Sequence, residues 1–395
     1  MEEAREPSVS ADQQSVSFLR RFTYPATWNR PATAPPATKY PSISSIPKIS
    51  PERLALASTD DDDDNPSSDS TKKKKTILYL AYGSNLSAQT FLGMRGIRPL
   101  SQINVSAPAF DLVFNLPGMP YMEPCFANTR PRQIPNNTPT PAASTTQLLL
   151  SPSDRGPTWS KGVYGVVYEV TPEDYATIIK TEGGGQGYQD VLTPCFELPP
   201  DLHVPEKPVV PRPFLAHTLY APDLSHEEGQ DRKGFPGRLF TPIHRNDAQP
   251  SARYLKLIRD GAREHGLPED YQTYLSQLRS YTVTRTRQYI GRILFLLFFL
   301  PLVGPFMVLG RLLADESGRT PRWLALGTTA AVNVSWIAYD CFFRPLFGDG
   351  ERTMTDDGDC GDDGFAYTGR RMVAIMYRED HAIVILNGEW SGDAG

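Results

Sequence analysis

The sequence has few of the residues from which disulfide frameworks and metal sites are built. Its four cysteines lie far apart in 395 residues, with no Cys-x-x-Cys pair and no neighbouring histidine: Cys125, Cys195, Cys341 and Cys360. The six histidines also lack the short spacings that place two ligands on one helix face. We therefore expect free thiols in a reducing compartment and no metal site.

A stripe of basic residues is missing as well. The 40 Lys and Arg are outnumbered by 45 Asp and Glu, for a net charge of -5, so we expect no nucleic-acid partner. The N-terminal end has no apolar core of a signal peptide, and its acidic residues do not suit the transit peptide that "FLRRF" (18–22) suggests. We expect no targeting from this end.

Composition divides the chain into four parts. Residues 1–75 are rich in Ser, Pro, Thr and Ala, and have too little apolar surface to offset chain entropy, which predicts disorder. Residues 76–285 have the pattern of a folded domain. Residues 290–345 are strongly apolar. Residues 346–395 are rich in Gly and Asp and are predicted to be mostly disordered, with one strand-like stretch, "RMVAIMYR".

The folded domain is predicted to combine strands with helices. Four apolar runs predict strands, at residues 76–82, 110–116, 162–170 and 214–221. Residues 253–278 predict two short helices, separated by Gly266 and Pro268. The fold class is therefore α+β, with a mixed sheet or small barrel and flanking helices.

Two proline-rich tracts interrupt this pattern, at residues 129–144 and 197–213. Proline lacks the amide that a central strand must donate. We therefore interpret both tracts as surface insertions.

The apolar C-terminal part predicts a transmembrane hairpin. Residues 293–310 form an uncharged run of the length that crosses a bilayer core, and residues 323–339 form a second, weaker one. The alternative is a pair of buried core helices, but the prolines and glycine of the first run favour a membrane. Arginines before the first run favour a cytosolic start, whereas Arg319 and Arg322 in the connecting loop oppose it.

The stretch "TPEDYATIIKTEGGGQGY" (171–188) predicts a helix with a carboxylate on its apolar face. Thr171 is a good N-cap, and from Tyr175 the apolar residues and Glu182 follow at i, i+3, i+4 and i+7. Glu182 is therefore predicted to point toward the core. Burial and the negative end of the helix dipole both disfavour a charged carboxylate there, which suits a general acid/base. The alternative is a glutamate at a frayed last turn that swings into water.

The pentapeptide "YGSNL" (82–86) directly follows the first predicted strand. Gly83 lets the backbone approach a ligand, while Ser84 and Asn85 can cap the next segment and leave main-chain amides pointing outward. Such amides bind an anion or a carbonyl oxygen. An ordinary strand-to-helix turn explains the same residues equally well. The glycines at 183–187 follow a helix, which is typical of a C-cap and flexible loop rather than a phosphate loop.

The order strand, "YGSNL", "VYGVVYEV" and a helix ending in Glu-Gly resembles the γ-glutamylcyclotransferase family over about residues 76–281. The resemblance implies that the chain has the fold of that family. It implies that Glu182 moves the proton, that Tyr188 lies near the site, and that the loop binds the γ-glutamyl group through main-chain amides. The loop residues are Tyr82, Gly83, Ser84, Asn85 and Leu86. Further agreement lies in the C-terminal helices, at Gly261, Ala262, Gly266, Leu267, Pro268 and Tyr271.

The reaction that the resemblance implies is an intramolecular cyclisation. The α-amine of the substrate attacks its own γ-carbonyl and releases 5-oxoproline with an amino acid or amine, so no cofactor is required. The expected partners are a small γ-glutamyl molecule, a lipid bilayer contacted by residues 293–339, and a second copy of the chain in a homodimer. The catalytic domain would face the cytosol. Two alternatives stay open: cyclotransfer from γ-glutamyl amines or isopeptides, and a non-catalytic binding module at a membrane.

Overall fold

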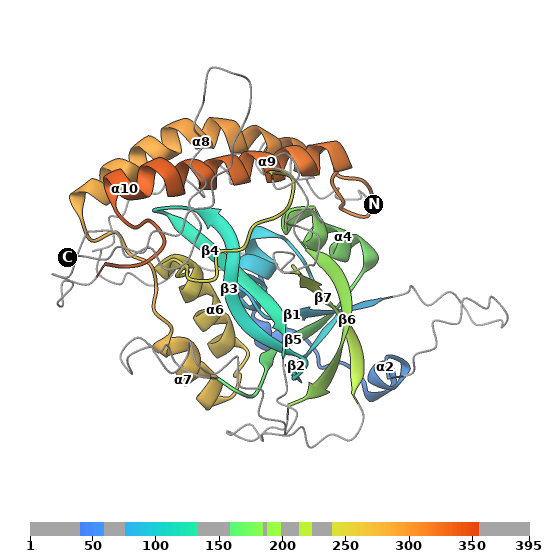
Figure 1. The fold of residues 1–395 in the computed structure, drawn as a ribbon. Coiled ribbons are helices and arrows are strands. Elements are labelled where there is room, and N and C mark those ends of the chain that lie inside the picture. The colour runs from blue at the N-terminus through green and yellow to red at the C-terminus, as the bar shows by residue number, and fades with distance from the viewer. Residues whose placement is uncertain are drawn as a thin grey trace, which may run out of the picture. The chain divides into compact units, whose positions relative to one another are not determined.

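The apolar runs that predict strands form a closed barrel (Figure 1). The computed structural model describes residues 40–58, 76–132, 159–184, 188–198, 213–222 and 239–354, and every structural statement below refers to these residues. The strands follow one another around the barrel in the order β1 (Ile77–Ala81), β5 (Val163–Val170), β2 (Ser101–Ala107), β6 (Gln189–Glu197) and β7 (Phe214–Tyr220). Neighbours are antiparallel, except that β7 closes on β1 in parallel.

The barrel is built around β5. Its sequence "VYGVVYEV" is buried at every position but one, because it pairs with β1 on one side and with β2 on the other. Continuous apolar runs are typical of strands that are covered on both faces. A separate two-stranded sheet, β3 (Phe110–Met119) and β4 (Glu123–Pro131), extends beside the barrel.

The four predicted strands are confirmed as β1, β3, β5 and β7, and the prediction missed β2, β4 and β6. The missed strands mix polar residues or proline with apolar ones, so their periodicity is weak. The first proline-rich tract, interpreted as an insertion from residue 129, begins inside β4, where Thr129 pairs with Leu112. Its proline, Pro131, stands at the last strand position, where the missing amide costs little. Most of both tracts lies outside the described residues.

Helix α4 (Pro172–Thr181) begins where the sequence predicts it. The Thr171 hydroxyl accepts a hydrogen bond from the amide of Asp174 at 3.1 Å, as an N-cap does. Tyr175, Ile178 and Ile179 are buried. This packing holds α4 against the barrel, where it contacts β1.

We expect Thr171→Ala to lower the free energy of unfolding by about 1 kcal/mol, since the amide of Asp174 loses its capping partner. The measurement is urea denaturation followed by circular dichroism. Thr177→Ala is the matched control, because the Thr177 hydroxyl bonds only the carbonyl of Glu173 on the exposed side of the same helix. Equal losses in the two variants would contradict the assignment of the cap.

The predicted helical pair is present as α6 (Ala252–Glu264) and α7 (Glu269–Gln277). Gly266 has a φ of +60° between them, and Pro268 immediately precedes α7. Helix α6 packs against the YGSNL segment, which is a contact that sequence spacing does not reveal.

One segment that was expected to be disordered forms structure. Within residues 40–58, helix α2 (Pro51–Leu56) follows a one-residue bridge between Lys48 and Gln102. Ile43 and Ile49 are buried, so a few apolar residues in a polar segment suffice to anchor it on the barrel. The rest of residues 1–75 and the stretch "RMVAIMYR" lie outside the described residues.

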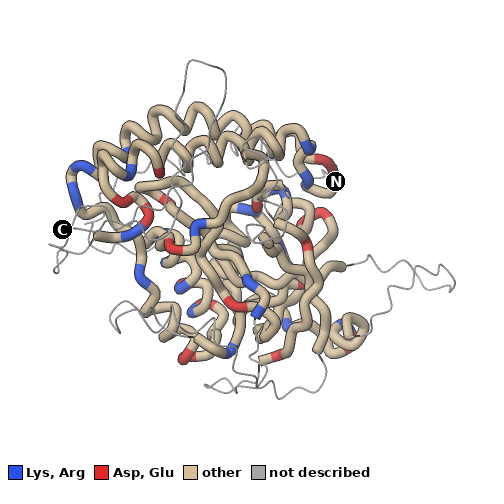
Figure 2. The backbone as a smooth tube through the Cα atoms, in the orientation of Figure 1, with Lys and Arg blue, Asp and Glu red and all other residues tan. Residues whose placement is uncertain are grey.

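The apolar C-terminal part forms two helices that lie side by side, α8 (Thr286–Leu312) and α9 (Arg322–Ala338). Among the described residues, α8 alone is long and apolar enough to cross a membrane, with a mean hydropathy of 2.5. Of the two spans expected, the one at residues 293–310 lies in a described helix of this length and composition, and the one at residues 323–339 does not. Both helices lack charged residues along their middle and have basic residues toward their ends (Figure 2).

An aromatic cluster joins this helix pair to the β3–β4 hairpin. Its buried members are Tyr121, Phe295, Trp336, Tyr339 and Phe343. The Arg245 guanidinium stacks 4.5 Å from the Trp336 ring centroid and pairs with Asp340 at 2.8 Å. The end of α9 and the short helices after it, Tyr339–Phe343 and α10 (Arg344–Phe347), are thereby held on the folded domain.

Candidate active site

Glu182 stands at the end of α4, where its amide donates to the carbonyl of Ile178 at 2.9 Å. Its side chain is 23% exposed. Oε1 accepts a hydrogen bond from Nδ2 of Asn85 at 3.0 Å and forms an ion pair with the guanidinium of Arg95. The structure therefore brings together two of the predicted site features, the inward glutamate and the YGSNL loop, which lie 97 residues apart.

Arg95 is a residue that the sequence prediction missed. It follows a π-helix (Gln89–Met94), and its side chain is only 6% exposed. Its guanidinium also donates to the hydroxyl of Thr181. Glu182 was expected to lie among apolar residues, but its carboxylate instead faces this buried cation.

The YGSNL loop forms a 3-10 turn over Ser84–Leu86. The amide of Leu86 donates to the carbonyl of Gly83 at 3.1 Å, so it is used inside the turn and not offered to a ligand. Among the described residues, no acceptor is recorded for the amides of Gly83, Ser84 and Asn85. Of the main-chain amides predicted to be available to a ligand, these three are therefore the candidates.

The side chain of Asn85 was expected to cap the next segment, but it does not. It is 3% exposed, and its Nδ2 donates to the hydroxyl of Tyr79 at 2.8 Å as well as to Glu182. Its Oδ1 is buried without a hydrogen-bond partner among the described residues. A buried acceptor without a donor costs about 1–3 kcal/mol, so this atom is suited to a donor on a bound molecule.

Three tyrosines, one in the loop and two beside it, are held by hydrogen bonds. The hydroxyl of Tyr82 donates to the carbonyl of Leu219 at 2.7 Å, and that of Tyr188 donates to the carbonyl of Ala127 at 3.3 Å. The amide of Ala127 donates to the hydroxyl oxygen of Tyr254 at 3.2 Å. Burial raises the pKa of all three phenols, with the charge of Glu182 adding to the effect, so they stay neutral. Tyr254, on α6, was not predicted.

Helix α6 packs closely against the YGSNL loop. Gly261 lies against the backbone of Leu86 and Ser87, and an added Cβ would come within 2.4 Å of the Leu86 carbonyl carbon. His265, which follows α6, places Nε2 3.1 Å from the Leu86 carbonyl oxygen and 2.8 Å from the Tyr168 hydroxyl. The conformation of the loop therefore depends on α6 as well as on its own sequence.

His265 predicts a loss of stability in mild acid. Burial lowers the pKa of this imidazole from 6.5 to about 4, against a smaller opposing effect of the Leu86 carbonyl. The unfolded chain takes up the proton near pH 6.5 and the folded chain only near pH 4. The free energy of unfolding therefore has its full contribution from His265 above pH 6.5. That contribution is lost as the pH falls through about 4, and the loss amounts to at most about 3 kcal/mol.

Urea denaturation of the wild type and His265→Gln at pH 7, 5 and 4 measures this effect. The wild type should lose more of its unfolding free energy between pH 7 and pH 4 than the variant does, because glutamine does not titrate. Parallel curves would show that His265 does not contribute.

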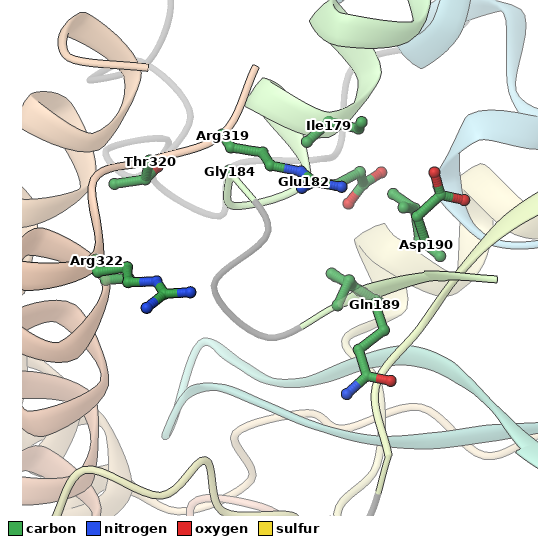
Figure 3. Close-up of a pocket in the computed structure, with 11 residues that line it drawn as sticks. Ile179, Glu182, Gly184, Gln189, Asp190, Arg319, Thr320 and Arg322 are labelled. Carbon is green, nitrogen blue, oxygen red and sulfur yellow. The ribbon is translucent and has the colours of Figure 1, made fainter. Parts of the chain in front are cut away.

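The site opens into a cavity of about 430 Å³. Figure 3 shows residues of three segments around it: Glu182 and Ile179 from the end of α4, Gln189 and Asp190 from β6, and Arg319 and Arg322 from the beginning of α9 and the turn before it. Tyr188 also lines it. The turn before α9 was expected on the far side of a membrane from this domain, and its place at the cavity is a feature that the sequence did not predict.

Asp190 is a second carboxylate at the cavity. Its Oδ1 lies 2.9 Å from Nδ1 of His217. Burial acts to raise the pKa of Asp190, but the hydrogen bond and charge of His217 outweigh it and hold that pKa below its usual value. Asp190 is therefore an anion paired with His217. Glu182 is paired with Arg95 and, in addition, contacts the YGSNL loop.

Comparison with known proteins identifies the family of this chain. The model of the AIG2-like family matches residues 223–275, which include α6. "Gamma-glutamyl cyclotransferase gliK" of Aspergillus fumigatus is 30% identical over 276 residues, which cover 70% of this chain and 89% of that protein. "Gamma-glutamyl cyclotransferase aclK" of Aspergillus oryzae is 25% identical over 295 residues, 70% of this chain and 90% of that protein.

Among solved structures, one described as "Gamma-glutamyl cyclotransferase" is 18% identical and covers 55% of this chain and 99% of its own, with a TM-score of 0.33. The chain belongs to the gamma-glutamyl cyclotransferase family, as its resemblance predicted.

Proposed function

We propose that this chain is an active cyclotransferase that converts a γ-glutamyl amino acid to 5-oxoproline and the free amino acid. The observation that carries the proposal is the contact between Glu182 and Asn85, which joins the YGSNL loop to a carboxylate that lines the cavity. A binding module would not need a carboxylate beside a set of unpaired amides. The family relationship supports the same activity.

The geometry supports a division of roles within the site. The amides of Gly83, Ser84 and Asn85 would hold the substrate carboxylate, and the buried Oδ1 of Asn85 would accept a hydrogen bond from its α-amine. Held in this way, the amine and the γ-carbonyl of one molecule are close enough to react without an enzyme nucleophile.

Glu182 would move the proton. It would take one from the α-ammonium, so that the nitrogen lone pair attacks the γ-carbonyl carbon and a new C–N bond closes the five-membered ring. The old C–N bond then breaks as Glu182 returns the proton to the leaving nitrogen, and the second proton that the ring nitrogen sheds also passes to the released amine, which leaves as an ammonium. Arg95 would keep the carboxylate in place between these two transfers.

The alternative substrates are γ-glutamyl amines and isopeptides. A panel of γ-glutamyl amino acids, glutathione, γ-glutamyl amines and an Nε-γ-glutamyl-lysine peptide, each assayed for 5-oxoproline, separates them. We expect turnover of the γ-glutamyl amino acids. Turnover of the amines or the isopeptide alone would overturn the substrate assignment and keep the reaction.

A second proposal concerns the location of the enzyme, at a membrane with the catalytic domain in the cytosol. Its support is the outward face of α8, where Leu297 and Phe298 are each 64% exposed and Leu312 is 67% exposed. The turn after α8 and the end of α9 both contact the catalytic domain. We therefore propose that this face enters the bilayer surface while the pair stays on the domain.

Flotation of the full chain with vesicles of phosphatidylcholine and phosphatidylserine tests this location. The wild type should float, and Leu297→Asp with Phe298→Asp should not. Leu56→Asp, at a 72% exposed position on α2, is the control for an added charge. A wild type that stays in the soluble fraction would refute the membrane proposal and leave the catalytic one untouched.

A further inference from the structure

The turn between α8 and α9, residues 313–321, is fastened to the catalytic domain at the end of α4. The amide of Thr320 donates to the carbonyl of Gly184 at 2.9 Å. Gly318 has a φ of +79°, and an added Cβ would lie 2.0 Å from the carbonyl oxygen of Ala176. The approach is so close that only glycine fits, so the contact is specific to this turn.

Hydrogen bonds within the turn hold its shape. The carboxylate of Asp315 accepts hydrogen bonds from the amide of Arg319 at 2.8 Å and from the hydroxyl of Ser317 at 2.7 Å. The amide of Asp315 in turn donates to the carbonyl of Arg319 at 2.9 Å. Such an arrangement orders the backbone on either side of Arg319. The position of Arg319 is thus set by the docked turn, and Arg322 follows at the first residue of α9.

Both arginines reach the cavity that contains Glu182 (Figure 3). The carboxylates that line this cavity already have cations: Glu182 has Arg95, and Asp190 is balanced mainly by His217 with a smaller effect of Arg319. No ion pair of either arginine at the turn is recorded among the described residues. The charges of Asp190 and Asp315 act on Arg319. However, Glu182 and Asp190 face three arginines at this cavity, so its side at the turn carries an excess of positive charge.

From this we infer that Arg319 and Arg322 bind a carboxylate on the leaving group of the substrate. The inference rests on the proposed function, which places the γ-glutamyl end at the YGSNL loop. The leaving nitrogen must then lie beside Glu182, so the group attached to it extends along the cavity toward the turn. Guanidinium groups bind carboxylates through paired hydrogen bonds, and a γ-glutamyl amine would offer them none.

The C-terminal helices thereby contribute to substrate binding. They close one side of the active site and select γ-glutamyl amino acids or peptides that end in a free carboxylate near the scissile bond. Neutral amines of the same size would bind without this contact.

The test uses two substrates of nearly identical shape, γ-glutamylglycine and γ-glutamylglycinamide, with the full chain. In Arg319→Gln/Arg322→Gln, we expect KM for γ-glutamylglycine to rise about tenfold, with kcat changed less than twofold, since charge-assisted hydrogen bonds are lost. KM for the glycinamide should not change. Arg287→Gln, on the exposed surface of α8 at the end away from the turn, is the matched control and should alter neither value.

Binding measured by calorimetry to Glu182→Gln, which holds substrate without turning it over, makes the result independent of catalysis. The added double substitution should weaken γ-glutamylglycine about tenfold and spare the glycinamide. Equal effects on the two ligands, or no effect on either, would overturn the inference. If the wild type turns over neither substrate while this selectivity in binding persists, the proposed function fails and the inference stands.

Discussion

Replacing Glu182 by glutamine should reduce kcat for 5-oxoproline formation roughly a thousandfold, within the range that a general acid/base contributes. Glutamine has nearly the same shape, and its side-chain oxygen can still accept the hydrogen bonds that Asn85 and Arg95 donate. It cannot take a proton from the α-ammonium. The substrate should therefore bind with little change in affinity and fail to cyclise.

The charge of Arg95 has to be considered when this variant is assayed. Its side chain is only 6% exposed, and removal of its anionic partner leaves a buried cation, which is destabilising. Far-UV circular dichroism and a thermal melt would separate a loss of fold from a loss of chemistry. Glu173→Gln, in the first turn of the same helix, is the control for the loss of a carboxylate. Retained turnover in folded Glu182→Gln would exclude this mechanism.

Gly261→Ala should destabilise the protein and reduce kcat/KM by about a hundredfold, as a shift of roughly 1 Å in a binding group does. Alanine in place of a helical glycine ordinarily stabilises a helix by about 1 kcal/mol. Here the added methyl group would lie 2.4 Å from the Leu86 carbonyl carbon and 2.6 Å from the amide nitrogen of Ser87. Either the loop or α6 must move, so the expected effect has the opposite sign.

Gly304→Ala in α8 is the matched control, because the nearest atom to its added methyl group is 3.9 Å away, in the flexible side chain of Leu300. Denaturation midpoints and steady-state kinetics of both variants measure the difference. A Gly261→Ala protein with wild-type kinetics would show that the loop does not depend on this contact.

The sequence predicts the features of this fold that depend on short-range patterns. The runs that became β1 and β5 are continuously apolar because both faces are covered, and the N-cap at Thr171 fixes the start of α4. Helical period predicts that Glu182 faces inward, with a glutamate swung into water as the open alternative, and the structure places its carboxylate against Asn85. In contrast, β2 and β6 have weak periodicity, and their position in the barrel comes from the neighbours with which they pair.

The parts of the site that the sequence does not predict depend on contacts between distant segments. No local pattern distinguishes Arg95 from the other arginines, because its partner Glu182 lies on α4. Tyr254 likewise has no local pattern that points to the loop. The apolar composition of residues 293–310 suggests a membrane crossing, but the hydrogen bond from Thr320 to Gly184 places the following turn on the catalytic domain. The composition of a helix does not predict the contacts made by the turns at its ends.

The most direct test is an analysis of products by NMR, with the full chain and a γ-glutamyl amino acid. The wild type should release 5-oxoproline and the free amino acid in equal amounts, and Glu182→Gln should release neither at a comparable rate. Glutamate in place of 5-oxoproline would mean hydrolysis by water rather than attack by the α-amine. That result, or the absence of any product from the wild type, would contradict the account given for Glu182 and the YGSNL loop.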